Sequence, residues 1–486
     1  MSFVLGLDGI DEYERNLRNI CNYAFAYGIK TYRASNPSFN PRTASKAESD
    51  KFIARCHEGF ALAQDLIVKQ LMQIQAKQRD YRSQLKDARH RRDKTEVCNC
   101  EANIIYLTNR EFVLRKVADG IAWQLWGLQR WNLRRLYLGR RMPYLDASNI
   151  DSVTSEVKDI NKDPLCFGLI ADITSFIQIG DILKVDRSSD VAKIHLIEMK
   201  SGEMNAKVID FIKQFDKIQC PRIPYFFAQE YGEKALAQAI RVTTQQMKAA
   251  QVLQIVQTGK GKDPYLDQDI NIPDDILLVD DYDETLNGLV GKCKSDGKAH
   301  SVIDECLFVG VYDPSRFPAY LSDFINFLYF TASGTGRKQE PFLHSEEFHI
   351  HQTKLFLQRA YPIYDLRLSL KIPLAQPLFM RRIAEETMLN IVFGKLIVLL
   401  YLDYDKWFGR AKSKGLEARW STEQEFRKCS EKGYFKVSDR IPVFEKQGGA
   451  IFIGNGILTR IIEGTTPDSI LELLDHSLTY HMEKKK

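Results

Sequence analysis

Two carboxylates and one ammonium group stand at the ends of apolar segments near the middle of the chain. The segment IHLIEMKSG, residues 194–202, is an apolar strand that closes with Glu198 and Lys200 just before a glycine turn. Asp181 begins the preceding apolar segment, DILKVDR. Charged residues are rarely placed among buried ones unless they are paired or have a task. These three side chains are therefore candidates for a shared chemical site.

A β-hairpin would bring the three side chains together. The polar stretch SSDVA separates the two apolar segments, which predicts an antiparallel hairpin. The register that places Asp181 opposite Glu198 also places Leu183 opposite Leu196, so apolar residues face each other. Directly opposed residues have Cβ atoms roughly 5 Å apart. Lys200, two residues beyond Glu198, projects from the same face.

Two carboxylates at that separation repel each other unless a cation lies between them. Mg²⁺ accepts one or two carboxylates together with waters and phosphate oxygens, and it leaves positions open for a substrate. We expect Mg²⁺ at Asp181 and Glu198, with Mn²⁺ able to substitute. Such an ion activates water and neutralises charge on a phosphodiester. Lys200 would orient the attacking water or stabilise the charge that develops on phosphorus oxygens.

Asp181, sixteen further residues and the tripeptide Glu198-Met199-Lys200 together resemble the motif of the PD-(D/E)XK nuclease superfamily. The resemblance implies an α/β fold with a restriction-endonuclease-like core, in which a central mixed sheet is flanked by helices. It implies a catalytic site of Asp181, Glu198 and Lys200. It also implies metal coordination by the main-chain carbonyl of Met199. Gly180 stands at the variable proline position of the motif.

Two other acids are alternatives within the same resemblance. Asp172 is the chief rival of Asp181, but the segment CFGLIADITSFIQI reads as a strand with Asp172 in its middle, out of register with Glu198. Glu111 is a weak match to the extra acid that some family members carry on a helix before the sheet. We therefore prefer Asp181.

The superfamily also places a helix after the third strand, often with a glutamine or basic residue directed at the metal or the phosphate. The segment YGEKALAQAIRVTTQQMKAAQVLQIVQTG has helical character and supplies Arg241 and Gln245. These residues are four apart and share a helix face. They are the expected nucleic-acid contacts of the core, although polar helix residues most often face solvent.

Two helical stretches concentrate positive charge. Residues 69–94 contain nine basic and three acidic residues, and residues 110–141 contain eight basic and two acidic ones, a net charge of +6 each. Basic side chains beside aromatic ones suit a phosphate backbone, whereas the alternative is a solvated face with tryptophans packed in the core. The predicted contacts with nucleic acid are Arg89, Arg91, Arg92, Arg134 and Arg135.

The remaining features bound the class of protein. The 486 residues carry 68 basic and 63 acidic side chains, a net charge of +5, which does not by itself identify a nucleic-acid binder. The N-terminus lacks the pattern of a signal peptide, and nine dispersed cysteines suit a reducing compartment. The longest apolar stretch, residues 388–402, is too short to span a bilayer and is expected to be a buried helix. We expect a cytoplasmic protein without membrane association.

Three segments are expected: an N-terminal helical arm at residues 1–100 with the long basic amphipathic helix, a nuclease-like core at 101–315, and a C-terminal α+β domain at 316–486. The expected function is hydrolysis of phosphodiester bonds in DNA, in restriction or antiviral defence, with RNA as an alternative substrate. The competing hypothesis is a nucleic-acid-binding or assembly scaffold whose nuclease fold is weak or inactive. The C-terminal domain would serve a homo-oligomer or a partner protein.

Overall fold

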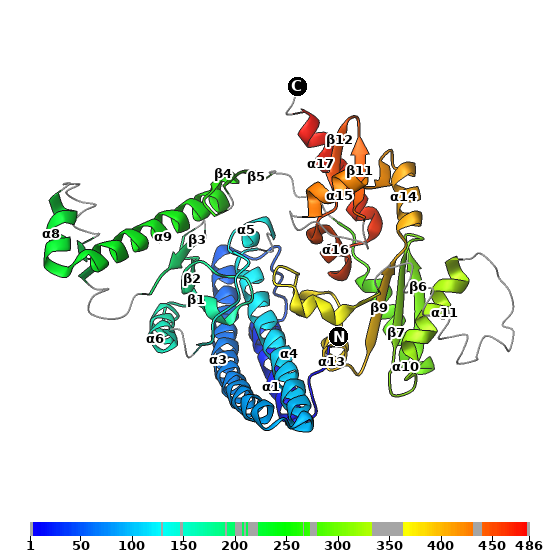
Figure 1. Cartoon of the computed structure of the whole chain (residues 1–486), viewed down its shortest axis with the longest axis horizontal. Helices are drawn as coiled ribbons and strands as arrows, with labels where there is room; N and C mark the ends of the chain where they lie inside the picture. Colours follow the sequence, from blue (N-terminus) through cyan, green and yellow to red (C-terminus); the bar gives the residue numbers. More distant parts are fainter. Residues whose placement is uncertain are drawn as a thin grey trace. The chain divides into compact units, whose positions relative to one another are not determined.

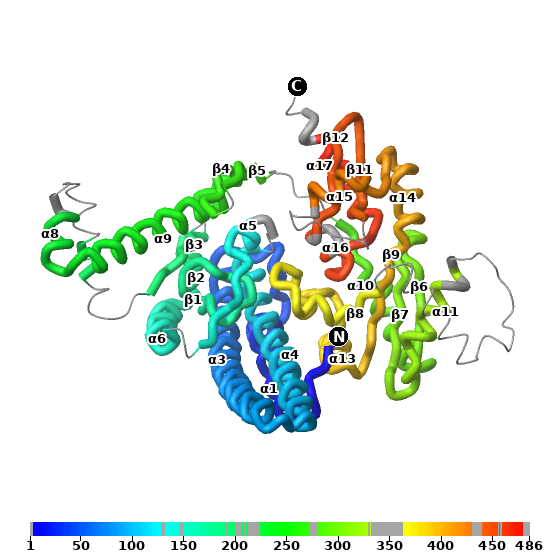
Figure 2. Tube along the Cα trace, viewed as in Figure 1, coloured from blue at the N-terminus to red at the C-terminus, as the bar shows by residue number. Residues whose placement is uncertain are grey.

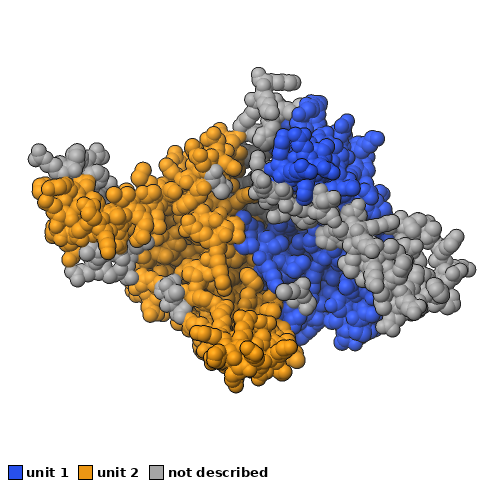
Figure 3. All heavy atoms as spheres, viewed as in Figure 1, with its two compact units in different colours: residues 1–4, 277–486 blue, residues 5–276 orange. Residues whose placement is uncertain are grey.

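The computed structural model describes residues 3–127, 130–145, 149–189, 192–199, 207–208, 210–211, 222–265, 267–272, 279–332, 363–430 and 440–483. The chain divides into two compact units (Figure 3), the N-terminal unit of residues 5–276 and the C-terminal unit of residues 277–486 with 1–4. This division differs from the expected boundaries at residues 100 and 315. The first of these falls inside a continuous helix, and the second falls between strands of one sheet.

The N-terminal unit is a layer of long helices beside a small sheet, followed by a helical hairpin (Figure 1). Its elements are α1 (Ile10–Cys21), the π-helix η1 (Asn22–Ala26), α2 (Tyr27–Ser35), α3 (Lys46–Arg91), α4 (Lys94–Leu125), α5 (Arg130–Arg134), α6 (Ile150–Ile160), β1 (Cys166–Ile170), the 3₁₀ turn η3 (Ala171–Ile173), β2 (Ile182–Asp186), β3 (Lys193–Ile197), α8 (Arg222–Tyr231), α9 (Glu233–Thr258), β4 (Lys260–Asp263) and β5 (Gln268–Asn271).

The two long helices begin and end at clear local signals. Ser45 and Glu48 form a capping box that starts α3, and the helix ends at Arg92, whose φ is +54°. Asp93 then caps α4, which packs along α3 (Figure 2). The first basic stretch, residues 69–94, is helical as far as Arg91, so the long basic helix predicted in the N-terminal arm is confirmed. The second one begins earlier than predicted and ends at Leu125, because Gly127 turns the chain with a φ of +61°.

The sheet of the N-terminal unit has the order β1-β2-β3, and both pairs are antiparallel. The predicted hairpin register is confirmed, since Leu183 pairs with Leu196 and Ile182 with Ile197. The expected mixed sheet is not found among the described residues, where every strand pair is antiparallel. The reason is that β4, the next strand described after β3, pairs with β5 instead of joining this sheet.

Helices cover both faces of this sheet. Phe167 of β1 packs against Phe60 and His57 of α3, with ring centroids 5.6 and 5.5 Å apart. On the other face, the Cα of Gly168 lies close to side chains of α6, where an added Cβ would stand 3.4 Å from the Val157 methyl group. The sheet is therefore the middle layer of a helix–sheet–helix arrangement.

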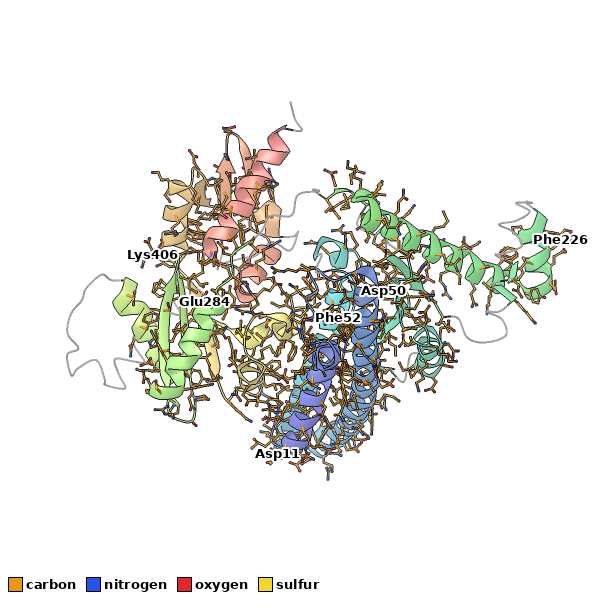
Figure 4. The ribbon with its side chains drawn as sticks, turned by 180° about the vertical axis from the view of Figure 1, so that it is seen from behind. Asp11, Asp50, Phe52, Phe226, Glu284 and Lys406 are labelled. Atoms are coloured by element: carbon orange, nitrogen blue, oxygen red, sulfur yellow. The ribbon has the colours of Figure 1, made fainter. Side chains whose placement is uncertain are left out.

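Helix α9 confirms the helix predicted after the third strand. It starts after Gly232 and ends before Gly259, whose left-handed conformation with a φ of +70° is typical of helix C-termini. Its Ala235, Ala239 and Val242 are buried against Phe227 of α8. By contrast, Tyr225 and Phe226 of α8 are exposed, and Phe226 is labelled in Figure 4.

The C-terminal unit is an α+β assembly with two sheets. Its order of strands is β6-β7-β9-β8 in one sheet and β10-β11-β12 in the other. Its elements are α10 (Asp283–Asp296), β6 (Lys298–Ile303), β7 (Leu307–Tyr312), α11 (Tyr320–Ala332), β8 (Tyr364–Asp365), the 3₁₀ helices η5 (Leu366–Lys371) and η6 (Leu378–Met380), α13 (Glu385–Val392), β9 (Ile397–Leu402), α14 (Tyr404–Ser413), β10 (Glu417–Trp420), α15 (Glu423–Ser430), β11 (Pro442–Lys446), β12 (Gly449–Phe452), α16 (Asn455–Ile462) and α17 (Pro467–Glu483).

The long apolar stretch at residues 388–402 is not one buried helix as expected. It forms the end of α13 and then the central strand β9, and both are buried. Gly394 separates them with a φ of +70°, and the run IVLLYL that follows favours a strand. Among the residues that the structure describes, none of the helices combines the length and apolarity needed to cross a bilayer.

Candidate active site

The ends of β2 and β3 form one wall of a cavity of about 880 Å³ in the N-terminal unit. Asp181 directly precedes β2, and its N–H donates to the carbonyl of Ile197 at 2.8 Å. Because Ile197 pairs with Ile182 in the ladder, the predicted pair of Asp181 with Glu198 lies beyond the paired residues. The Asp181 carboxylate in turn accepts a hydrogen bond from the Met199 N–H, with Oδ2 2.5 Å from the nitrogen. The side chains of Asp181 and Glu198 both line the cavity.

Gly180 sets the start of this wall. Its φ is +76°, and an added Cβ would stand 3.1 Å from the Ile197 carbonyl oxygen. A side chain at this position would therefore strain the backbone and press on the partner strand. The close approach of β3 and the positive φ together explain why glycine occupies this position.

Helix α9 supplies the opposite wall. Arg241 and Gln245, which the sequence predicted to share a face, line the same cavity as Asp181 and Glu198. Both side chains are exposed along α9. The structure thus brings together four predicted site residues that come from segments about 50 residues apart in the sequence.

Asp172 does not lie in the middle of a strand as expected. Strand β1 ends at Ile170, and Asp172 belongs to the 3₁₀ turn η3 that follows it. Its side chain lines the cavity that also holds Asp181 and Glu198. The sequence predicted one longer strand because the residues on both sides of this turn are apolar, as in a strand.

Three basic residues of the cavity were not assigned to the site from the sequence. Arg140, Arg141 and Lys248 line it, and both arginines are exposed. Both arginines belong to the second basic stretch, residues 110–141, so the positive charge of that stretch could have identified them as site residues. The whole stretch was predicted to be helical, whereas Arg140 and Arg141 lie in an irregular segment after α5.

Tyr265 marks the electrostatic contact between the acidic and basic sides of the cavity. Burial raises the pKa of its phenol; the Arg140 guanidinium opposes this rise and the Glu198 carboxylate adds to it. Lys248 Nζ lies 5.1 Å from the centroid of the Tyr265 ring, which suits a cation–π interaction. The site therefore contains both signs of charge, because the Glu198 carboxylate and the Arg140 guanidinium both lie close enough to affect Tyr265.

Arg135 is not a nucleic-acid contact as predicted. Its side chain is buried, and its Nη1 lies 2.8 Å from Oδ2 of Asp263, which is buried as well. The ion pair ties α5 to β4 and leaves Arg135 facing the interior. Arg134, its neighbour, is exposed and remains available for an external partner.

The basic end of α3 lies at a different place from the cavity. Arg89, Arg91 and Arg92 are exposed, and none of them lines the cavity. Arg89 pairs with Glu101 of α4 at 2.7 Å and borders a separate groove of about 610 Å³ between the two helices. An exposed pair of this kind is weak and can be exchanged for another anion.

Glu111 has a structural role. Its carboxylate accepts from Arg115 Nη2 at 2.8 Å and from the side-chain amides of Gln75 and Gln78 at 3.1 and 3.3 Å. It does not line the cavity, so it is not the extra acid that the resemblance suggested. Lys200, the third residue of the motif, lies outside the described residues.

The donors at the end of the hairpin fit a hard divalent cation. The two carboxylates and the Met199 carbonyl offer only oxygen, the ligand that Mg²⁺ and Mn²⁺ prefer. Among the described residues, no group of three or more histidine, cysteine, aspartate or glutamate side chains is arranged to hold a metal ion.

Comparison with family models, curated proteins and solved structures finds no match to this chain. Its function is therefore inferred from the chemistry of the cavity, because fold alone does not specify a reaction.

Proposed function

We infer that the chain is a metal-dependent nuclease that hydrolyses phosphodiester bonds of DNA. The observation that supports this most is the cavity itself, which is lined by Asp181 and Glu198 together with Arg241 and Gln245. Carboxylates alone would suit any divalent cation. The guanidinium and amide groups opposite them add the donors that a phosphodiester requires.

Each residue has a defined task in this proposal. Asp181, Glu198 and the Met199 carbonyl would hold Mg²⁺ or Mn²⁺, which supplies an activated water and neutralises charge on the phosphodiester. The Met199 N–H bond fixes one oxygen of Asp181, so the carboxylate is held in place before a substrate arrives. Arg241 and Gln245 would bind non-bridging phosphate oxygens, and Lys200 would orient the attacking water.

The broader assignments follow the same resemblance. We propose a restriction-endonuclease-like core built on β1, β2 and β3, a cytoplasmic location and a role in restriction or antiviral defence. RNA is the alternative substrate, because the chemistry of such a site does not select the sugar.

A nucleic-acid-binding or assembly scaffold is the second candidate function. It is favoured by the small size of the sheet and by the large C-terminal unit, which would serve a partner protein or a homo-oligomer. In this case nucleic acid would bind the cavity and the basic surfaces without being cleaved.

One experiment separates the two functions. Purified full-length protein is incubated with plasmid DNA, linear DNA and RNA in Mg²⁺, Mn²⁺ or EDTA. The nuclease proposal expects cleavage that requires the metal and is lost in Asp181→Ala, Glu198→Ala and Lys200→Ala, while nucleic-acid affinity in EDTA stays near that of the wild type. Cleavage that persists in EDTA would reject the metal site, and binding without cleavage of any substrate would favour the scaffold.

A further inference from the structure

We propose that Arg140 and Arg141 form a phosphate-binding arm of the cavity, and that the side-chain amide of Gln178 holds this arm in place. The arm would bind backbone phosphates of the nucleic-acid strand that enters the cavity. The identity of the ligand rests on the proposed function, whereas the role of Gln178 rests on contacts within the chain.

Gln178 binds the arm through both ends of its amide. Its Oε1 accepts from the N–H groups of Leu138 and Arg140 at 2.8 and 3.1 Å, and its Nε2 donates to the Arg140 carbonyl. Nε2 also lies 3.4 Å from the Met142 sulfur. The Gln178 N–H donates to the Leu136 carbonyl at 2.9 Å. Segment 136–142 has no helix or strand hydrogen bonds to hold it, and the hydrogen bonds of Gln178 take over this role.

The same short segment also positions the carboxylates. Gln178 is followed by Ile179, Gly180 and Asp181, and all four residues line the cavity. Gly180 is held against the Ile197 carbonyl by its backbone conformation. The arm and the carboxylate at the start of β2 are consequently set relative to each other by four consecutive residues.

The charge of the arm is directed outward. Arg140 and Arg141 are exposed, and within the described parts of the chain neither guanidinium forms an ion pair. Arg135, five residues earlier, is buried and paired with Asp263. The difference indicates that Arg135 serves the fold, whereas the two later arginines carry charge available to an anionic ligand.

The chemistry of the arm suits phosphate. A guanidinium group donates two parallel hydrogen bonds to phosphate oxygens, and it stays charged at all relevant pH values. Two adjacent arginines at the mouth of a cavity that also contains carboxylates favour a polymer with successive phosphates. Each of the two arginines can bind one of two successive phosphates, which a nucleic-acid strand supplies.

The test measures binding of a duplex oligonucleotide by the full-length protein in EDTA, where cleavage is absent, over a range of salt concentrations. Each phosphate contact contributes about −0.9 to the slope of log affinity against log salt on duplex DNA. The variant Arg140→Gln/Arg141→Gln should reduce the magnitude of that slope by about 1.8. Arg33→Gln changes an exposed arginine of α2 outside the cavity and is the matched control, expected to bind like the wild type.

The outcomes distinguish the arm from the nuclease. An unchanged slope in the double variant, or a wild type that binds no nucleic acid, overturns the arm. A reduced slope in the double variant supports the arm even if the wild type cleaves nothing, in which case only the nuclease proposal fails.

The positioning role of Gln178 is tested by combining variants. Gln178→Ala alone should reduce the slope in the same direction as the arginine variants, because the arm is no longer fixed. Added to Arg140→Gln/Arg141→Gln, it should change the slope little further, since the charges it positions are already absent. Additive effects would show that Gln178 acts on binding by another route. If Gln178→Ala does not fold, the arginine variants, which change exposed side chains, still decide the proposal.

Discussion

The cavity and the buried polar layer of α4 both concentrate charge in the N-terminal unit, but they direct it differently. We define this layer as the buried Arg115, Lys116 and Asp119 together with the half-buried Glu111. Lys116 Nζ lies 2.9 Å from Asp119 Oδ2, and both side chains are almost fully buried. Asp119 also accepts from the N–H and the hydroxyl of Ser175 at 2.7 and 2.6 Å. The charges of the layer are therefore satisfied by the chain itself.

In the cavity, Arg140, Arg141 and Arg241 are exposed and face a space large enough for a ligand. The two regions are linked, because Arg115 of the layer donates to the carbonyls of Asp172 and Thr174. Asp172 in turn lines the cavity. The comparison indicates two kinds of charged group. Those paired within the chain support the fold, whereas the exposed arginines of the cavity are available to a ligand.

The largest effect is expected at the carboxylates of the cavity. If the chain is the proposed nuclease, Asp181→Asn and Glu198→Gln should each lower the cleavage rate by about 10³-fold or more, equivalent to about 4 kcal/mol of transition-state stabilisation, because each would remove a ligand of the proposed metal. Thermal unfolding should be little changed, since these substitutions keep the size of the side chain. Initial rates of plasmid nicking in Mg²⁺ and an unfolding curve measure the two properties.

Asp186→Asn is the matched control, because Asp186 lies at the other end of the same hairpin. Its activity should equal that of the wild type. A rate loss in Asp186→Asn as large as in Asp181→Asn would mean that the hairpin, and not the cavity, is what the substitutions disturb.

The buried layer should respond in the opposite way. Asp119→Ala leaves the ammonium group of Lys116 buried without its partner, which costs about 3–5 kcal/mol of unfolding free energy. Urea denaturation measures this loss. In Asp159→Ala, which breaks an exposed pair with Lys162, stability should stay close to that of the wild type. An Asp119→Ala protein as stable as this control would contradict the structural role of the layer.

Arg135 and Arg134 test the same distinction in neighbouring residues. Arg135→Ala leaves the Asp263 carboxylate buried and unpaired, so a destabilisation of about 3 kcal/mol is expected. Arg134→Ala changes an exposed side chain and should alter stability by less than about 0.5 kcal/mol. Denaturation of the two variants side by side checks both values. If Arg135→Ala were as stable as Arg134→Ala, the ion pair of Arg135 with Asp263 would not be a buried one that supports the fold.

The sequence predicted the hairpin well because alternating apolar residues and opposite charges allow few registers. Residues such as Leu183 and Leu196 pair as expected, and the helix carrying Arg241 and Gln245 follows. The sequence could not separate Arg134 from Arg135, because burial at α5 depends on Asp263, which is 128 residues away from Arg135. Long-range pairing of this kind leaves no local pattern.

Irregular segments were the other source of error. Asp172 seemed to continue a strand because apolar residues flank it, but the chain turns after Ile170. Arg140 and Arg141 lie in a segment whose conformation depends on the Gln178 side chain, 38 residues later than Arg140. A helix or strand pattern cannot reveal a structure that is held by one distant amide.

The smallest effect concerns His57, a titratable residue that belongs to the packing of the sheet. Its ring is buried against Phe167, and its Nδ1 lies 2.9 Å from the Pro164 carbonyl oxygen. Burial lowers the pKa of His57 to about 4, although the hydrogen bond with Pro164 opposes this shift. The unfolded chain takes up a proton near pH 6.5, whereas the folded protein does so only near pH 4. Stability is therefore fully present above pH 6.5 and is lost as the pH falls towards 4. At pH 5 the loss should be about 2 kcal/mol.

The variant His57→Gln tests this coupling, because glutamine does not titrate. Its fall in unfolding free energy between pH 7 and pH 5, measured by urea denaturation, should be smaller than that of the wild type by this amount. Parallel curves for the wild type and His57→Gln would mean that the protonation of His57 is not coupled to folding.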